Sequence, residues 1–381
     1  MTTPTSPIAS EPTPAVPPRL EAKPGILDIA PYVGGDHSAE GVNRVFRLAS
    51  NENTIGPSPK AKAAYAAIAG EIHRYPDGQS DRLRRTIGRV NGLDPARIVC
   101  GAGSDELLQI LTKCYAGVGD EVLYSQYGFM MYPIAAKSVG AVPVAAPERD
   151  LCTDVDALLA RVTERTRILF LANPNNPTGS WLPRAEMRRL HAGLPGNVLL
   201  VIDAAYAEYV EDADYDPGIE LVDDAENVVM TRTFSKIYAL AGLRLGWMYG
   251  SPAVVDVVNR VRGPFNVTLA AQEAGVAAME DEAFVQHSRE TATRWREWLT
   301  AELAALGLTV YPSVANFVLV RFPSEPGRDA AAALAFLKRR GVLVRGMAGY
   351  GLPDCLRIGI GIEEEMRAVQ ATVADFLAGR P

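Results

Sequence analysis

The chain is poor in the residues that bind metal ions and form disulfides. Its 381 residues include only four cysteines and four histidines. The cysteines are widely spaced and none belongs to a C-x-x-C pair, so they predict neither a disulfide framework nor a metal cage. They stand at Cys100, Cys114, Cys152 and Cys355. We therefore expect no bound metal, and cysteines that serve as small apolar residues in a reducing compartment.

Long hydrophobic runs and an excess of positive charge are also absent. No apolar stretch is long enough to span a bilayer. The first 24 residues are rich in Pro, Ser and Thr and lack the hydrophobic run of a signal peptide, so we expect a disordered tail over residues 1–24 and a cytoplasmic protein. The net charge of −7 argues against nucleic acid or an anionic membrane as a partner.

The chain is long enough for two domains of ordinary size. From about residue 58, amphipathic stretches alternate with short runs that are nearly continuous in Val, Ile and Leu, as is typical of strands covered on both faces. Seven runs are predicted as strands: Arg97–Cys100, Glu121–Tyr124, Ala141–Val144, Ile168–Ala172, Val198–Asp203, Val228–Thr231 and Leu245–Tyr249.

This alternation predicts an α/β fold, with a mainly parallel seven-stranded sheet flanked by helices in a large domain over residues 58–265. After about residue 265 the pattern changes. A long helical stretch, Leu269–Leu306, precedes short strands and helices that predict a smaller α+β domain over residues 266–381. Residues 25–57 are expected to form an N-terminal arm associated with the small domain.

Lys236 lies in the polar segment that follows the apolar run Val228–Met230. Strand ends in such sheets face the ligand crevice. The hydroxyls of Thr233 and Ser235, with Arg244 eight residues after the lysine, have the chemistry to bind a phosphate. A lysine that forms an imine needs burial or nearby cations to lower its pKa. The alternative is an exposed lysine at the start of a helix.

Two neighbouring runs also end in polar residues. Asp203 ends one of them, and Asn176 lies in the Pro/Asn/Gly turn that follows Ile168–Ala172. Three strand ends therefore bring an amide, an acid and an amine to one rim. A fourth segment, Gly101–Ser104, opens a helix whose N-terminus attracts phosphate, although a simple N-cap explains Ser104 equally well.

The combination resembles the fold-type-I pyridoxal-phosphate aminotransferases, and within them the histidinol-phosphate aminotransferases, from about residue 24 to residue 378. No single segment is specific, but their joint occurrence in this order is. The matching segments are Leu48–Asn53 with Gly56–Pro59, Arg74–Asp77, Gly103–Glu106, Tyr127–Phe129, Asn173–Gly179, Thr233–Trp247 and Tyr350–Arg357.

The resemblance implies pyridoxal 5′-phosphate as the cofactor, with Lys236 as its Schiff-base lysine and proton carrier. Asp203 is expected to pair with the pyridine nitrogen, and Asn176 and Tyr206 to hydrogen-bond the phenolic oxygen of the ring; Lys236, Asp203 and Tyr206 are the catalytic candidates. Tyr127 is expected to stack on the ring. The phosphate is expected to be bound by Ser104, Asp105, Thr233, Ser235 and Arg244.

The resemblance also implies a homodimer with shared sites, because Tyr75 matches a tyrosine that reaches the cofactor phosphate of the neighbouring subunit. Arg357 is expected to bind the carboxylate of glutamate and the phosphate of the other substrate in turn. Arg345 and Tyr32 are expected to add phosphate contacts, and Asn53 to line the mouth of the site.

The activity implied is reversible amino exchange between histidinol phosphate and 2-oxoglutarate in histidine biosynthesis. An aromatic amino-acid aminotransferase on the same scaffold is the main alternative, because a flat ring and an anionic tail describe both substrates. A decarboxylase of a phosphorylated amino acid and a non-catalytic protein of the same fold are further alternatives.

Overall fold

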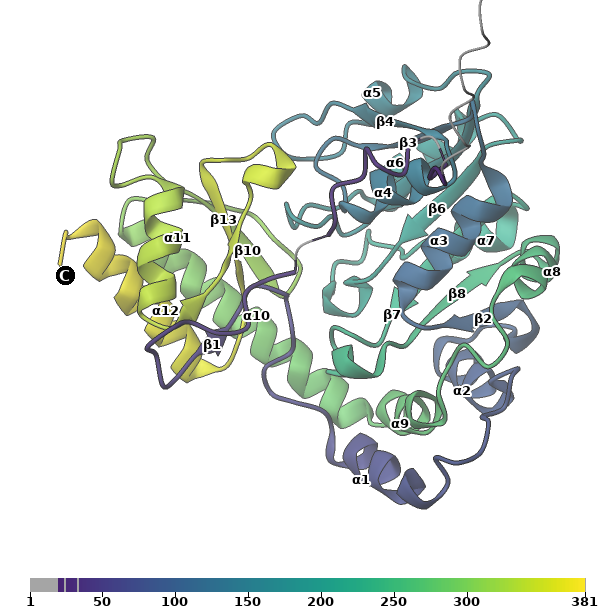
Figure 1. Ribbon diagram of the computed structural model, residues 1–381, viewed down its shortest axis with the longest axis horizontal. Coiled ribbons are helices and arrows are strands. Elements are labelled where there is room, and N and C mark those ends of the chain that lie inside the picture. The colour runs from purple at the N-terminus through teal and green to yellow at the C-terminus, as the bar shows by residue number, and fades with distance from the viewer. Residues whose placement is uncertain (1–19, 24, 33, 381) are drawn as a thin grey trace, which may run out of the picture.

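The computed structural model describes residues 20–23, 25–32 and 34–380. Most of the predicted disordered tail, residues 1–19 and 24, lies outside the described residues. A large α/β part contains the seven-stranded sheet, and a small part built on a second sheet lies beside it (Figure 1). The chain runs through the arm into the large part and ends in the small part.

The seven-stranded sheet is mixed but mainly parallel, and it confirms the predicted fold class. Its order is β2-β8-β7-β6-β5-β3-β4, and β8 alone runs antiparallel to both of its neighbours. The strands are β2 (Ile98–Gly101), β3 (Glu121–Ser125), β4 (Val142–Ala146), β5 (Thr166–Ala172), β6 (Leu199–Asp203), β7 (Val228–Thr233) and β8 (Gly246–Gly250). Every residue of β6 and β7 is buried, which explains why these runs do not alternate in hydropathy.

Helices cover both faces of this sheet. Leu107, Leu111 and Tyr132 pack with Val258 on one face, and Leu83, Ile87 and Leu190 belong to the core on the other. The helices are α1 (Pro59–Ala67), α2 (Asp81–Asn91), α3 (Ser104–Tyr115), α4 (Met131–Ser138), α5 (Val155–Leu159), α6 (Arg184–Ala192), α7 (Ile219–Asp224), α8 (Pro252–Val261) and α9 (Leu269–Met279).

The small part has an antiparallel sheet with the order β12-β13-β10-β9 and its own hydrophobic core. The N-terminal arm joins it through β1 (Phe46–Arg47), which pairs in parallel with β11 (Val342–Leu343). The remaining elements are α10 (Glu282–Ala305), β9 (Thr309–Tyr311), β10 (Phe317–Arg321), α11 (Ala330–Arg339), β12 (Arg345–Gly346), β13 (Cys355–Gly359) and α12 (Glu363–Leu377).

The predicted single helical stretch over residues 269–306 is wrong, because the chain breaks it into α9 and α10 at Glu280 and Asp281. The reason is packing. Gly275 in α9 lies close to Leu83 and Leu245, so this helix belongs to the core of the large part. Only α10 runs on to pack against the strands and helices of the small part. Within the described residues, no helix combines the length and apolarity that crossing a membrane requires.

Candidate active site

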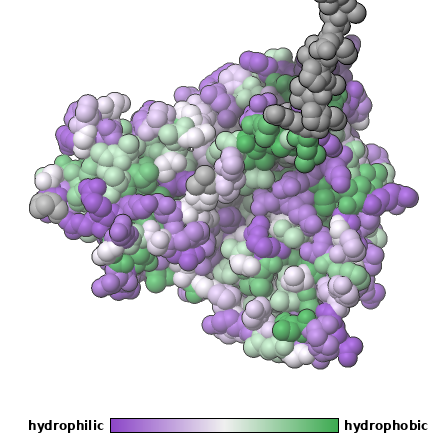
Figure 2. Space-filling view, viewed as in Figure 1, coloured by the Kyte–Doolittle hydropathy of each residue, from purple (hydrophilic) through white to green (hydrophobic). Residues whose placement is uncertain are grey.

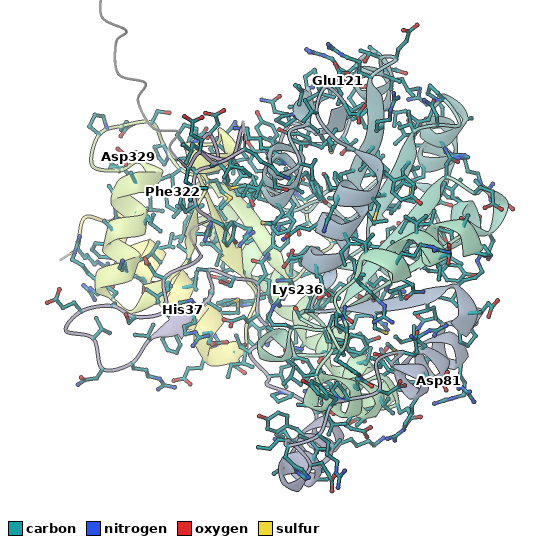
Figure 3. All side chains as sticks on the ribbon, turned by 45° about the vertical axis from the view of Figure 1, so that its right-hand side comes forward. His37, Asp81, Glu121, Lys236, Phe322 and Asp329 are labelled. Carbon is teal, nitrogen blue, oxygen red and sulfur yellow. The ribbon has the colours of Figure 1, made fainter. Side chains whose placement is uncertain are left out.

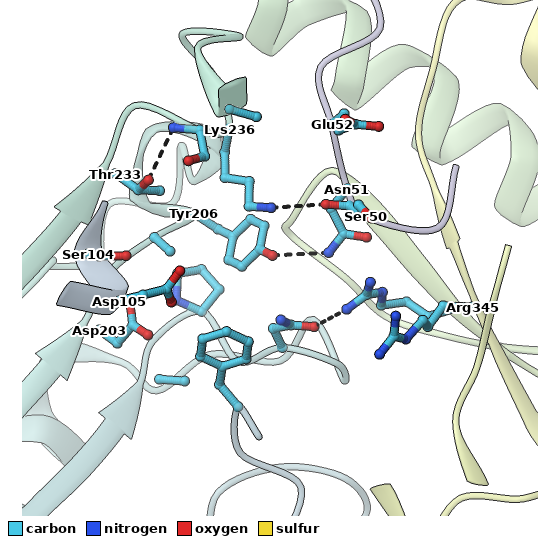
Figure 4. A pocket seen from close by; sticks show the side chains of 18 of the residues that line it. Ser50, Asn51, Glu52, Ser104, Asp105, Asp203, Tyr206, Thr233, Lys236 and Arg345 are labelled. Carbon is cyan, nitrogen blue, oxygen red and sulfur yellow. Dashed lines mark hydrogen bonds between the residues drawn. The ribbon is translucent and has the colours of Figure 1, made fainter. Parts of the chain in front are cut away.

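A pocket of about 240 Å³ lies between the carboxyl ends of the large-sheet strands, the N-terminal arm and the small sheet. Lys236 lies between the large and small parts (Figure 3). Most of the predicted site residues line this pocket: Tyr32, Ser104, Asp105, Asn176, Asp203, Tyr206, Thr233, Ser235, Lys236, Arg244, Arg345 and Arg357. The view into the pocket shows Asp203, Tyr206 and Lys236 on one side and Asn51 and Arg345 on the other, with their side chains directed toward one another (Figure 4).

Lys236 follows the end of β7, and its amine points across the pocket to the arm (Figure 4). Its Nζ donates a hydrogen bond to the carbonyl oxygen of Ser50 at 3.1 Å. Burial lowers the pKa of Lys236 from its ordinary value to about 8, and the positive charge of Arg357 acts in the same direction. The neutral amine, which is the nucleophilic form, is therefore far more abundant near pH 7 than in an ordinary lysine.

Asp203 ends β6 at the floor of the pocket and is only 6% exposed. Its Oδ2 accepts a hydrogen bond from the hydroxyl of Tyr132 at 2.9 Å, whereas Oδ1 is buried without a hydrogen-bond partner. Burial raises the pKa of this carboxyl to about 6. An unpartnered buried acceptor beside a pocket fits a ligand that brings an N–H donor, such as the protonated nitrogen of a pyridine ring.

The N-terminus of α3 forms a cradle with the arginine of the segment after β7. Gly103 has a φ of +86°, and a Cβ at this position would lie 2.5 Å from Nη2 of Arg244. Arg244 donates hydrogen bonds to Ser235 Oγ at 3.2 Å and to Asp105 Oδ2 at 3.0 Å. The first N–H groups of a helix lack intrahelical partners, so this cradle fits one phosphate group.

Tyr206 and Asn176 connect this half of the pocket to the opposite wall. Nδ2 of Asn51 donates a hydrogen bond to the hydroxyl of Tyr206 at 3.0 Å. Arg357 in β13 donates to Oδ1 of Asn176 and, at 2.7 Å, to the carbonyl oxygen of Ala49. The arginine is only 6% exposed, and its Nε has no hydrogen-bond partner.

Arg345 and Tyr32 form the outer part of the same wall. The guanidinium of Arg345 lies 5.7 Å from the centre of the Tyr32 ring. Arg345 lies opposite Arg357 in the register of β12 and β13, so the two arginines enter the pocket from adjacent strands. Two neighbouring guanidinium groups suit a ligand that carries two negative charges.

Tyr127 and Asn53 are not among the residues that line this pocket, so their predicted roles stay predictions. Tyr127 lines a separate cavity with Glu148, and Phe129, two residues later, lies in the wall of the candidate site. Asn53 instead donates to the carbonyl oxygen of Ile237 and to Ser288 Oγ, both at 3.0 Å. These hydrogen bonds join the arm to α10 and to the segment after Lys236.

Tyr75 lies outside the pocket on the surface of the chain. Its side chain is 82% exposed and stacks on Phe265 with ring centres 4.6 Å apart. Its predicted contact with a neighbouring subunit therefore stays a prediction.

Several lining residues have no counterpart among the sequence predictions. Asn51, Glu52 and Tyr350 line the pocket together with Phe129. Asn51 and Phe129 lie in segments that carry the family resemblance, so that signal was available, whereas Tyr132, which supports Asp203, carries no motif. No group of three or more His, Cys, Asp or Glu side chains in the described ranges is arranged to hold a metal ion.

Comparisons with known proteins agree with this geometry. The family model "Aminotransferase class I and II" matches residues 43–372. The chain is 62% identical to a histidinol-phosphate aminotransferase of Rhodospirillum centenum over 356 residues, covering 93% of this chain and 98% of that protein. It is 59% identical to one of Paramagnetospirillum magneticum, with the same two coverages.

A solved structure extends the likeness to three dimensions. The structure of histidinol-phosphate aminotransferase from Sinorhizobium meliloti, in complex with pyridoxal-5′-phosphate, superposes with a TM-score of 0.86 at 30% identity. The match covers 95% of this chain and 99% of that one.

Proposed function

This chain belongs to the class I and II aminotransferase family, and we propose that it transfers an amino group between L-histidinol phosphate and 2-oxoglutarate in histidine biosynthesis. One observation carries the proposal: Lys236, Asp203 and the phosphate cradle of α3 and Arg244 line a single pocket that also holds two arginines. The near-full-length relatives at 59–62% identity bear the same activity in their names.

The cofactor of the proposed reaction is pyridoxal 5′-phosphate, which supplies an electron sink for the carbanion formed at the substrate α-carbon. Its phosphate fits the cradle formed by the N-terminus of α3, Ser235 and Arg244. Phe129 and the unpartnered Oδ1 of Asp203 would hold its ring, and Asn176 and Tyr206 would hydrogen-bond its phenolic oxygen.

Lys236 and Asp203 are the residues of this chain that would take part directly in the reaction. The amine of Lys236 would hold the cofactor covalently between turnovers and, when released as a neutral amine, would accept the proton of the substrate α-carbon and become an ammonium group. Asp203 would stabilise a positive charge on the ring nitrogen. Its pKa of about 6 leaves it mainly ionised at pH 7, as this role requires.

The opposite wall binds the substrate. We assign Arg357 to the α-carboxylate of glutamate in one half-reaction and to the phosphate of histidinol phosphate in the other, with Arg345 and Tyr32 as further phosphate contacts. Burial lowers the pKa of Arg357 from its ordinary value, yet a guanidinium remains charged at neutral pH. A buried cation with an unpartnered Nε gains most from an anionic ligand.

The working unit that we propose is a homodimer. Hydrophobic residues reach the surface near α1 (Figure 2), where Ile72 is 75% exposed and Tyr75 82%. An apolar hollow of about 290 Å³ opens against α1, lined by Tyr65, Leu240 and Leu243. The proposal requires that a second copy cover this face and bring its Tyr75 to the phosphate cradle of the first. The predicted cytoplasmic location stays a prediction.

The decisive test of the substrate is a comparison of kcat/KM for histidinol phosphate and for phenylalanine with 2-oxoglutarate as the acceptor. We expect histidinol phosphate to be preferred. A tenfold preference for phenylalanine, about 1.4 kcal/mol of transition-state stabilisation, would establish an aromatic amino-acid aminotransferase instead. Release of carbon dioxide without a keto-acid acceptor would favour a decarboxylase.

A further inference from the structure

A buried tyrosine lies behind the floor of the pocket and contacts its acid. Tyr132, in α4, is 1% exposed and does not line the pocket. Its hydroxyl donates to Oδ2 of Asp203 at 2.9 Å. The ionised carboxylate can only accept hydrogen bonds, so this contact occupies one of its oxygens and leaves Oδ1 as the oxygen available to a ligand.

The ring of Tyr132 also contacts the aromatic wall. It stacks on Phe170 of β5, with ring centres 4.7 Å apart and planes within 6°. The ring of Phe129 meets it edge-on, with the centres 5.9 Å apart and the planes at 90°. Phe129 lines the pocket and Asp203 forms part of its floor, so one side chain supports two of the surfaces on which a flat ring would rest.

We propose that Tyr132 is a positioning residue that directs Oδ1 of Asp203 toward the cofactor ring nitrogen and supports Phe129 on the face of that ring. This inference rests on the proposed function. Tyr132 touches neither the cofactor nor the substrate. It acts by holding the carboxylate in one rotamer, which costs no reorganisation when the ring binds.

The hydrogen bond from Tyr132 has a second effect, on the pKa of Asp203. Burial raises the pKa of Asp203, and the hydrogen bond from Tyr132 acts in the opposite direction. Two charged groups face the same carboxyl: Asp105 of α3 raises its pKa, and Lys236 lowers it. Burial also raises the pKa of Tyr132 well above its ordinary value, so its hydroxyl stays a donor at every working pH.

The test uses Tyr132→Phe, which removes the hydroxyl and keeps the ring. Tyr124→Phe is the matched control, because Tyr124 meets Tyr132 edge-on with ring centres 6.3 Å apart but does not contact Asp203. Binding of pyridoxamine 5′-phosphate to the full-length apoprotein is measured by fluorescence between pH 5 and pH 8. This probe carries the ring and the phosphate but has no aldehyde to react with Lys236.

We expect Tyr132→Phe to weaken binding about tenfold at pH 7, since a hydrogen bond to a charged group is lost. In the wild type, affinity should fall as the pH drops through about 6, where Asp203 takes up a proton. Without the hydroxyl, the carboxyl holds its proton more tightly, so this midpoint should move to higher pH. Tyr124→Phe should match the wild type in both measures.

A double-mutant cycle separates positioning from general packing. In an Asp203→Asn background, Tyr132→Phe should weaken binding less than twofold, because the group through which it acts is already neutral. A tenfold loss in that background, or an equal loss in Tyr124→Phe, would overturn the proposal.

If the wild type binds the probe, and Tyr132→Phe binds it with the same affinity and the same pH midpoint, this inference alone is overturned. A wild-type protein that does not bind the probe would overturn the proposed function as well.

Discussion

The two walls of the pocket differ in how their side chains are held. On the large part, Asp105 is paired with Arg244 and Asp203 with Tyr132, so these side chains are oriented before any ligand binds. On the opposite wall, Arg357 bonds to a backbone carbonyl and to Asn176, a residue of the first wall. Under the proposed function, the wall of the large part holds the ring and the phosphate of the cofactor, and the opposite wall exchanges the substrates.

The largest effect is expected when the amine of Lys236 is removed from the wall of the large part. We expect Lys236→Ala to lower turnover at least about 10⁴-fold, because a nucleophile and a general base are lost together. After borohydride reduction, mass spectrometry should find no cofactor attached to the protein. Lys113→Ala, an exposed lysine of α3, is the control and should behave as the wild type. Turnover within tenfold of normal would contradict the assignment of Lys236.

The next largest effect is expected on the substrate wall. Arg357→Lys keeps the charge but loses the planar fork, so KM for glutamate and for histidinol phosphate should each rise about tenfold to a hundredfold. The cofactor affinity should change little. Arg321→Lys in the neighbouring strand β10 is the control. A rise for one substrate only would show that the two anions are bound by different residues.

A third prediction tests whether the walls act on each other. Because the pKa of Lys236 is about 8 and its neutral amine is the nucleophile, capture of pyridoxal 5′-phosphate by the apoprotein should quicken about tenfold per pH unit below 8 and level off above. Arg357→Gln removes a cation that lowers this pKa, so the midpoint should move upward. Stopped-flow absorbance measures both. A midpoint near 10.5 in the wild type would show an ordinary exposed lysine.

The smallest effect is expected from the wall that a second subunit would supply. Tyr75→Phe should weaken cofactor binding about fivefold, as expected for one lost hydrogen bond, and leave the dimer intact in sedimentation. Tyr65→Phe is the control, because it removes a hydroxyl from the same face. An unchanged cofactor affinity, or a wild-type protein that sediments as a monomer, would contradict the shared site.

The large-part wall was largely predictable from the sequence, and the physical reason is regularity. Strands buried on both faces appear as unbroken apolar runs, so the polar residue that ends each run is identifiable, as with Asp203. The carboxyl ends of parallel strands meet at one edge, which brings Asn176, Asp203 and Lys236 together without further information.

The predicted site residues that do not line the pocket lie where the backbone leaves regular structure. After β3 the chain turns sharply, with the N–H of Gly128 bonded to the carbonyl of Ser125, and this turn rather than any periodicity directs Phe129 instead of Tyr127 into the pocket. In the arm, Asn51 has a φ of +53°, which breaks an extended alternation and places Asn53 against α10. Tyr132 depends on α4, a helix with no motif to mark its inward face.

The pairing of β1 with β11 has a consequence for the order in which the chain becomes structured. Arg47 leaves the ribosome early, but its partner Leu343 is among the last residues made. All seven strands of the large sheet, β2 to β8, are synthesised long before that, so we expect this sheet to form first. The arm residues that face Lys236 therefore stay unpaired while the large sheet folds. The substrate wall is completed only when translation is nearly finished.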